Sequence, residues 1–408
     1  MQFRYILRSF NSSKHQFLSI ILIFSLTILK SQEISVPKFG KGILQLKGQE
    51  DTWSMNLSFR MQLLTMADFE DNQINNSSYN SLIRRSRIKM SGFAINPKLK
   101  YKFELGLSNR DLSGANEFTS NSPRYILDAY VDWNFYKKFR IRFGQGKLPG
   151  NMERVISSGN LSLVDRSILN SKFTIDRSFG IQFRNQFNLG KVFLSRQIIA
   201  ISPGEGRNVT TGNIGGHQYT YRIELLPFGS FDSKGDYFGL DLKRELSPKL
   251  MLASSFDINK NAVKTRSNMG SYMIIENGFF KTDIQTIFVD AHFKFRGFSL
   301  MYEFAKRTAD DPIAKDSYNN PTGDIVNVGS SNNVQFSYLT NSNFAFTLRN
   351  TNINYDQIHQ FNNNKQLTFG ISKLFRGHKL KIQSDLTFEE KYKSKKSLIY
   401  RFQIDIHF

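Results

Sequence analysis

The sequence has no cysteine and little proline, 9 residues in 408. Without cysteine, a disulfide framework, a thiolate metal site and a cysteine nucleophile are all excluded. Long hydrophobic runs are also scarce: the run at residues 17–29 is too short to span a bilayer comfortably, and the mean hydropathy is −0.38. Acidic residues are in the minority, 34 against 55 Lys and Arg, which gives a formal net charge of +21. This charge predicts anionic partners.

Catalytic and cofactor motifs are missing as well. None of the six histidines lies in a motif that links it to a serine or to an acid pair, and an activated nucleophile needs such a base beside it. The sequence has no phosphate-binding loop, nucleotide fingerprint or cluster of metal ligands. It therefore predicts a protein that is not an enzyme and has neither a metal site nor a cofactor. The histidines are His15, His217, His292, His359, His378 and His407.

Aromatic residues are plentiful, with 38 Phe and 16 Tyr, and they fall on one face of alternating segments. In residues 53–63, Trp, Met, Leu and Phe occupy every second position, and Ser, Asn, Arg and Gln occupy the positions between them. Eleven alternating residues are about what a tilted membrane strand requires. An apolar outer face and a polar inner face are typical of a barrel in lipid with a wet lumen.

The alternation recurs along the whole chain and predicts an all-β fold, a transmembrane antiparallel β-barrel of about sixteen strands. Short turns alternate with long polar loops, as expected for periplasmic turns and extracellular loops. An even strand number also places both termini in the periplasm. The predicted strands are residues 53–63, 82–92, 99–108, 125–135, 139–146, 178–187, 191–202, 217–226, 249–258, 282–295, 298–308, 332–340, 343–353, 364–375, 379–389 and 397–408.

The N-terminal segment predicts export. Arg4, Arg8 and Lys14 precede the apolar run at residues 17–29, and small or polar residues follow it. We interpret residues 1–32 as a signal peptide, with a retained anchor as the alternative. Residues 33–52 would form a periplasmic lead-in and residues 53–408 the barrel, in the outer membrane of a Gram-negative bacterium.

Two partners fit the charge and the compartment, namely small anions and acidic lipopolysaccharide. Nucleic acid is not expected, because an exported protein seldom meets it and no recognition motif or basic helix is present. The last predicted strand ends on Phe408. A terminal aromatic on an alternating strand resembles the signal that the barrel-assembly machinery of the outer membrane recognises.

Cations occupy the inner face of several predicted strands. In residues 82–92, Ile88 and Met90 point one way, and Arg85, Arg87 and Lys89 point the other, toward the lumen. A solvated face of a surface strand is the alternative. Inward acids could pair with the cations, so each inward arginine is either an anion site or half of a structural ion pair. The inward acids are Glu104, Asp128, Asp132, Glu224, Asp290 and Asp405, and the other candidate cations are Arg60, Arg140, Arg142 and Arg184.

The connection at residues 147–177 differs from the other loops, because it mixes Leu, Ile, Val and Phe with charged residues. A loop with apolar residues packs on something, so we expect it to fold inward and narrow the lumen. An extracellular lid is the alternative. Its candidate constriction residues are Glu153, Arg154, Asp165 and Arg166.

Several motifs in order, LSFRMQ at residues 57–62, IRRSRIKMSG at 83–92, LDAYVDWNF at 127–135 and RIRFGQGKLPG at 140–150, resemble the phosphate-selective porin O and P family. The resemblance runs from about residue 42 to residue 408. It implies sixteen-stranded barrels, typically trimers, with an arginine-lined lumen and an inward third loop. It also implies that Arg60, Arg84 and Arg85 line an anion site. Strict alternation turns Arg84 away from Arg85, so either a bulge aims both at the pore or Arg84 has another role.

The sequence therefore predicts an outer-membrane porin with a basic, arginine-lined lumen for passive diffusion of small anions, with phosphate or polyphosphate as candidates. A non-conducting structural or secretion-associated barrel is the alternative, because a plugged lumen leaves no mark in the sequence.

Overall fold

The computed structural model describes residues 33–35, 37–70, 77–211, 213–358, 363–392 and 395–408. The predicted signal peptide and His359 lie outside these residues. Sixteen strands form a closed antiparallel barrel, and β24 closes it against β3 from Ser397↔Glu70 to His407↔Arg60. The barrel strands are β3 (Trp53–Glu70), β4 (Ser77–Ala94), β5 (Leu99–Gly106), β6 (Ile126–Tyr136), β7 (Phe139–Lys147), β8 (Arg177–Leu189), β9 (Phe193–Ser202), β10 (Gln218–Leu226), β11 (Lys249–Ala262), β16 (Thr282–Phe295), β17 (Phe298–Ala309), β20 (Gly329–Leu339), β21 (Phe344–Tyr355), β22 (Asn364–Leu374), β23 (Leu380–Lys391) and β24 (Lys395–His407).

Each of the sixteen predicted strands is present, which confirms the fold class. The predicted strands at residues 53–63 and 82–92 are too short at the ends that face the loop between them, because β3 continues to Glu70 and β4 already begins at Ser77. Polar residues pair across these strand ends, as Asp68 does with Ser78. The hydroxyl oxygens of Thr65 and Ser81 are 3.1 Å apart. The polar residues therefore belong to the loop-side ends of β3 and β4, and they do not mark where these strands end.

Apolar side chains cover the outside of the barrel. Phe143 is 49% exposed and Phe369 46%, whereas the alternate positions face the interior. This is the arrangement expected of strands in contact with lipid. Among the described residues, no helix is long and apolar enough to cross a membrane.

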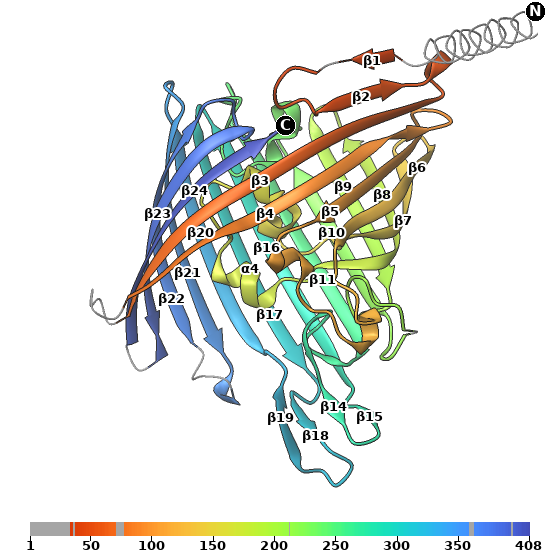
Figure 1. The fold of residues 1–408 in the computed structure, drawn as a ribbon, viewed down its shortest axis with the longest axis vertical. Coiled ribbons are helices and arrows are strands. Elements are labelled where there is room, and N and C mark those ends of the chain that lie inside the picture. The colour runs from red at the N-terminus through yellow and green to blue at the C-terminus, as the bar shows by residue number, and fades with distance from the viewer. Residues whose placement is uncertain (1–32, 36, 71–76, 212, 359–362, 393–394) are drawn as a thin grey trace, which may run out of the picture.

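The predicted lead-in contains strands that the sequence did not reveal. β2 (Leu44–Lys47) pairs with β3 from Leu44↔Leu57 to Lys47↔Ser54, and β1 (Glu33–Ser35) pairs with β2. The two strands lie beside the barrel at the end that holds the C-terminus (Figure 1). A single turn of 3-10 helix, η2 (Gln49–Asp51), connects β2 to β3. The lead-in is thus part of the sheet.

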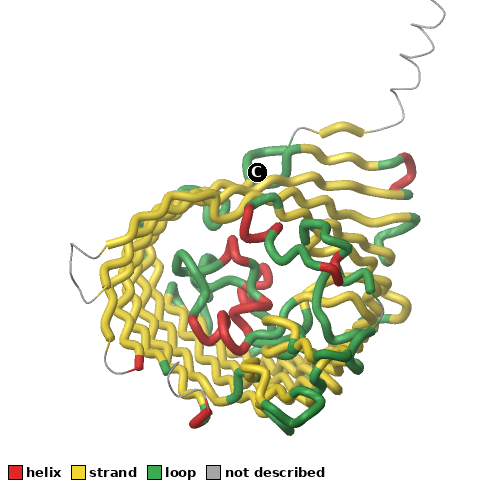
Figure 2. Tube along the Cα trace, turned by 60° about the horizontal axis from the view of Figure 1, so that its bottom comes forward, coloured by secondary structure: helices red, strands yellow, loops and turns green. Residues whose placement is uncertain are grey.

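Helices and loops fill much of the barrel interior (Figure 2). Residues 148–176, here called the inserted segment, contain α3 (Met152–Val155), η5 (Ser158–Asn160) and α4 (Ile168–Phe173). Phe173 and Ile175 are fully buried against the wall residues Phe288 and Ala305. This packing confirms the inward placement of the loop. Other short elements inside or at the mouths are α2 (Asn109–Leu112), η4 (Glu117–Thr119) and η6 (Asp232–Tyr237).

The two ends of the barrel differ. At the end opposite the termini, long loops form three hairpins, of which β14–β15 and β18–β19 project below the barrel in Figure 1. At the other end, the long connection at residues 227–248 packs against the inserted segment, where Gly239 N donates to Asn160 O at 2.8 Å. The hairpin strands are β12 (Lys264–Arg266), β13 (Met269–Tyr272), β14 (Ile274–Ile275), β15 (Gly278–Phe279), β18 (Ile313–Lys315) and β19 (Pro321–Ile325).

Candidate functional site

A β-bulge brings Arg84 and Arg85 to the same side of β4. Gln62 pairs with Arg85 and the next residue of β3, Leu63, pairs with Ile83, so Arg84 is the extra residue. Both arginines are buried, at 4% and 5% exposure, although adjacent residues of a regular strand point to opposite faces. The first of the two alternatives left by the sequence, a bulge, is the one observed.

The inserted segment meets this arginine pair through one carboxylate. Arg84 Nη2 lies 2.5 Å from Asp165 Oδ1, and Arg85 Nη2 lies 3.5 Å from the same oxygen. Burial raises the pKa of Asp165, but Arg84 and Arg85 more than offset this and hold it well below its usual range. Asp165 is therefore ionised at neutral pH, and two guanidinium groups share its single negative charge.

Arg60 contacts the same segment without a carboxylate. Its Nη2 donates to Ser158 Oγ at 2.7 Å, and its buried Nε has no hydrogen-bond partner among the residues that the structure describes. Gly159 permits the close approach, because a Cβ there would lie 2.4 Å from Arg60 Nη1. Arg60, Arg84 and Arg85 are thus all placed where the inserted segment lies against β3 and β4.

The other inward cations of β4 differ in their partners. Arg87 forms ion pairs with Asp111 at 2.9 Å and with Glu104 at 3.3 Å. Lys89 is only partly buried. Within the part of the chain that the structure describes, no carboxylate lies within ion-pair distance of Lys89. The charge of Arg87 is therefore largely balanced, whereas that of Lys89 is not.

Strands β7 and β8 carry a second group of inward arginines. Arg142 pairs with Asp132 at 2.7 Å and stacks on the ring of Tyr130, 3.9 Å from its centroid. Arg140 reaches the same carboxylate only at 3.8 Å and is 44% exposed. Arg184 donates to Gln182 and has no ion pair among the described residues. Here too, cations outnumber the acids that face them.

The remaining residues predicted for the constriction serve mainly to hold the inserted segment together. Glu153 accepts hydrogen bonds from Ser167 N and Oγ and pairs with Arg349 at 3.3 Å. Arg166 Nε donates to Glu153 O at 2.7 Å. Burial lowers the pKa of Arg166 to about 10, so its guanidinium remains charged at neutral pH. Arg154 forms an ion pair with Asp176.

Residues of β10, β16 and β17 anchor the inserted segment. The sequence did not reveal these contacts. Asp290 accepts a hydrogen bond from Met152 N at 3.2 Å, and Glu303 accepts one from Glu153 N at 2.7 Å. Arg222, fully buried, pairs with Asp290 at 2.6 Å. Two wall carboxylates thus satisfy the free amides at the start of α3. Alternation predicted that Asp290 faces inward, but not what it touches.

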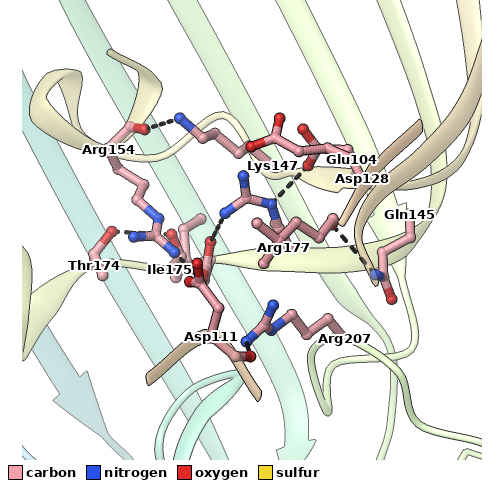
Figure 3. Close-up of polar contacts among 12 residues, drawn as sticks. Glu104, Asp111, Asp128, Gln145, Lys147, Arg154, Thr174, Ile175, Arg177 and Arg207 are labelled. Atoms are coloured by element: carbon pink, nitrogen blue, oxygen red, sulfur yellow. Dashed lines mark hydrogen bonds and ion pairs between the residues drawn. The ribbon is translucent and has the colours of Figure 1, made fainter. Parts of the chain in front are cut away.

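The sequence also missed three cations, which lie at the end of β7, at the start of β8 and in the connection after β9. Arg177 Nε donates to Asp128 Oδ1 at 2.6 Å, and Arg207 Nη2 donates to Asp111 O at 2.8 Å (Figure 3). Lys147 Nζ donates to the carbonyl oxygen of Arg154 at 2.8 Å. Arg177 and Lys147 lie just outside the predicted strands at residues 178–187 and 139–146, so a one-residue error at each boundary hid them.

The inward cations of β10 to β23 and those of β4 to β8 differ in solvent exposure. On β10 to β23, the inward cations are fully buried beneath the inserted segment and the 227–248 connection, namely Arg222, Arg307, Arg349, Lys294 and Lys381. On β4 to β8, Arg84, Arg85 and Arg177 are buried as well, but other cations keep contact with solvent: Lys102 is 22% exposed and Arg140 44%. The most exposed of these cations therefore lie on β4 to β8, and Arg196 on β9 and Arg401 on β24 are exposed to a smaller extent, 15% and 13%. No group of metal-ligating residues was found among the described residues.

A sixteen-stranded barrel with an apolar outside, long loops at one end and an inserted segment in its lumen defines the porin class of outer-membrane proteins. The chain belongs to the phosphate-selective porin O and P family, whose model matches residues 55–319. This membership places it in the outer membrane of a Gram-negative bacterium, as the export signal and the strand pattern predicted. The family and the fold are those of channels and not of an enzyme class.

Other comparisons agree with the fold. An uncharacterized protein of Aquifex aeolicus (strain VF5) is 29% identical over 238 residues, 51% of this chain and 57% of that protein, so the match spans little more than half of the relative. The anion-selective porin from Comamonas acidovorans superimposes with a TM-score of 0.54 at 12% identity, covering 87% of this chain and 100% of that one. The outer membrane channel DcaP of Acinetobacter baumannii gives 0.50 at 11%, covering 87% and 97%.

Proposed function

We propose that the protein is a porin that passes small anions along the wall of β4 to β8, with phosphate or polyphosphate as the candidate substrates. The observation that carries this proposal is the excess of water-accessible cations on that wall, where Lys89 and Arg184 face the interior without an ion pair among the described residues. On β10 to β23, by contrast, the inserted segment and the 227–248 connection bury the inward cations.

Arginine and lysine favour anions in such a passage for physical reasons. The guanidinium group stays charged at physiological pH, and its planar fork of donors replaces part of the hydration shell of an oxyanion. A narrow passage with low-dielectric walls concentrates anions further. A permeant ion must also leave, so several moderate sites serve better than one deep site. A series of cations, each partly balanced by nearby acids, meets this requirement.

The pair Arg84 and Arg85 is the proposed binding site for phosphate. The two guanidinium groups converge on a single carboxylate, Asp165, whose oxygens take the place that oxyanion oxygens would occupy. A passing phosphate would share these donors with Asp165. This competition is expected to weaken binding enough for release.

The reversal potential of the purified full-length protein in a planar bilayer under a KCl gradient tests the proposal. An anion-selective current that phosphate blocks saturably supports it, and Arg85→Ala should remove the block. A cation-selective current would contradict an arginine-lined anion path. No current at all would favour the other candidate, a non-conducting structural or secretion-associated barrel, for which the filled interior is the relevant observation.

Asp165→Asn is expected to increase anion selectivity, because Asp165 is the only carboxylate of the described residues within ion-pair distance of Arg84 and Arg85, and the substitution removes its charge while keeping the side-chain shape. The reversal potential should shift toward the anion value, and phosphate should block at lower concentration. Asp310→Asn, at an exposed position of the extracellular end, is the matched control and should leave both quantities unchanged. An unchanged reversal potential in Asp165→Asn would show that this carboxylate does not affect the permeating ions.

Further proposed partners are lipopolysaccharide around the barrel, two further copies of the chain in a trimer, and the barrel-assembly machinery acting through Phe408. Phe408 N donates to Phe59 O at 2.9 Å, and its ring lies 5.6 Å from that of Phe39. Phe408→Ala is expected to reduce the amount of folded barrel in the outer membrane several-fold, and Phe408→Tyr to preserve it. Heat-modifiable migration of membrane fractions measures this, and equal amounts for both variants would refute the role.

A further inference from the structure

The apolar outer belt ends abruptly on β21 to β24. Outward residues of these strands lie in rows across the sheet, because the cross-strand register is regular. One row is fully apolar or aromatic and consists of Leu348, Phe369, Leu386 and Tyr400. Two residues further toward the long-loop end, the row contains Asn350, Leu367, Phe388 and Leu398. The next row is fully polar and consists of Asn352, Lys365, Glu390 and Lys396.

A pocket of about 450 Å³ lies at this boundary, and most of its lining residues belong to these outward rows. Leu367 and Phe388 line its apolar part, and they are 43% and 52% exposed. Lys365 and Lys396 line its polar part. The pocket is therefore amphipathic, with its apolar side continuous with the belt and its charged side at the extracellular rim.

The charges in the polar row do not cancel. Two lysines flank Glu390, which is paired in register with Lys365 on one side and with Lys396 on the other. Within the described residues, neither lysine comes within 4 Å of a carboxylate oxygen, so both ammonium groups are free to donate to another partner. The row thus presents a net positive charge on the outer face of the barrel, at the long-loop end.

We propose that this pocket is a binding site for a phosphorylated, multiply acylated glycolipid of the outer leaflet. Its acyl chains would lie along Leu367, Phe388 and the apolar row beyond them, and its phosphate would accept hydrogen bonds from Lys365 and Lys396. Asn350 and Asn352 are placed to bind sugar hydroxyls. The two requirements, apolar contact and phosphate contact, are met by one molecule only if it is an amphiphile at the rim.

Two other occupants fit less well. A free phosphate ion would leave the exposed Leu367 and Phe388 without a partner. A second copy of the chain that packed through the same row would remove both lysines from water and offer only one carboxylate, Glu390, for two lysines. An unpaired buried charge is strongly unfavourable. The proposal depends on the outer-membrane location alone, so it fails or holds independently of anion conduction.

The test uses the full-length protein in detergent and measures its affinity for bis-phosphorylated lipid A by native mass spectrometry. Lys365→Gln with Lys396→Gln should bind lipid A about tenfold more weakly than the wild type, since each lysine at a membrane surface contributes modestly to binding an anionic lipid. The matched control replaces two exposed lysines elsewhere at the same end, Lys281→Gln with Lys306→Gln, and should bind like the wild type. Heat-modifiable migration verifies that each variant is folded, and the single variants replace the double one if it is not.

Ligand comparisons complete the test. Lipid A without its acyl chains and phosphatidylglycerol should each bind at least tenfold more weakly than lipid A, and millimolar inorganic phosphate should not displace lipid A. Equal affinity of the double variant and the control would overturn the proposal. So would displacement by inorganic phosphate, which would identify a free-anion site, or a loss of lipid binding on dimer or trimer formation, which would identify a protein contact.

Discussion

Glu153→Ala is expected to release the inserted segment and to increase single-channel conductance several-fold. Glu153 is 1% exposed and is held by Ser167 and by Arg349, which is itself buried. Removing the carboxylate leaves the guanidinium group of Arg349 buried without its partner, and a broken buried ion pair costs about 3–5 kcal/mol. Single-channel recording gives the conductance, and the temperature at which heat-modifiable migration is lost gives the stability.

A double variant and a surface variant make this result interpretable. Glu153→Leu with Arg349→Met removes both charges, so it should be less destabilised than Glu153→Ala. Glu276→Ala, at an exposed position of the loop between β14 and β15, should match the wild type. If Glu153→Ala keeps the wild-type conductance and stability, the ion pair does not hold the segment in place.

Arg84→Gln combined with Arg85→Gln and Asp165→Asn is expected to abolish phosphate block and to lower anion selectivity. The triple variant removes two positive charges and one negative charge, so no buried carboxylate is left unpaired. Hydrogen bonds to charged groups contribute about 1.5–3 kcal/mol each, and 1.4 kcal/mol corresponds to a tenfold change in affinity. Phosphate should therefore block at concentrations at least tenfold higher, as measured by titration in a planar bilayer.

The same wall supplies a control with a larger net charge change. Arg140 and Arg184 are paired in register on β7 and β8, so Arg140→Gln with Arg184→Gln removes two cations at a distance from the inserted segment. This variant should lower the selectivity while keeping phosphate block. If the two sets of substitutions affect block equally, no site is localised at Arg84 and Arg85, and binding is spread along the wall.

The alternation of side chains was sufficient to predict all sixteen strands, because lipid on one side and polar groups on the other impose a period of two. It could not predict the bulge at Arg84, since one extra residue leaves no mark in the stretch Arg84-Arg85-Ser86-Arg87. It also could not identify what the inward residues touch. Asp290 and Glu303 bind the start of α3 because the segment packs there, and such contacts depend on tertiary structure alone.

Two strands pair with the same edge of β3, namely β24 at residues 60–70 and β2 at residues 54–57. Phe408 N donates a hydrogen bond to the carbonyl oxygen of Phe59, and Ile43 N donates one to the carbonyl oxygen of Leu57, two residues away. The N-terminal hairpin and the closing strand therefore abut on one edge. A shift of β24 by two residues toward the periplasm would preserve the facing of every side chain, but it would collide with the hairpin. The N-terminal strands thus block this shifted pairing of β24 with β3, which the alternation of side chains alone would allow.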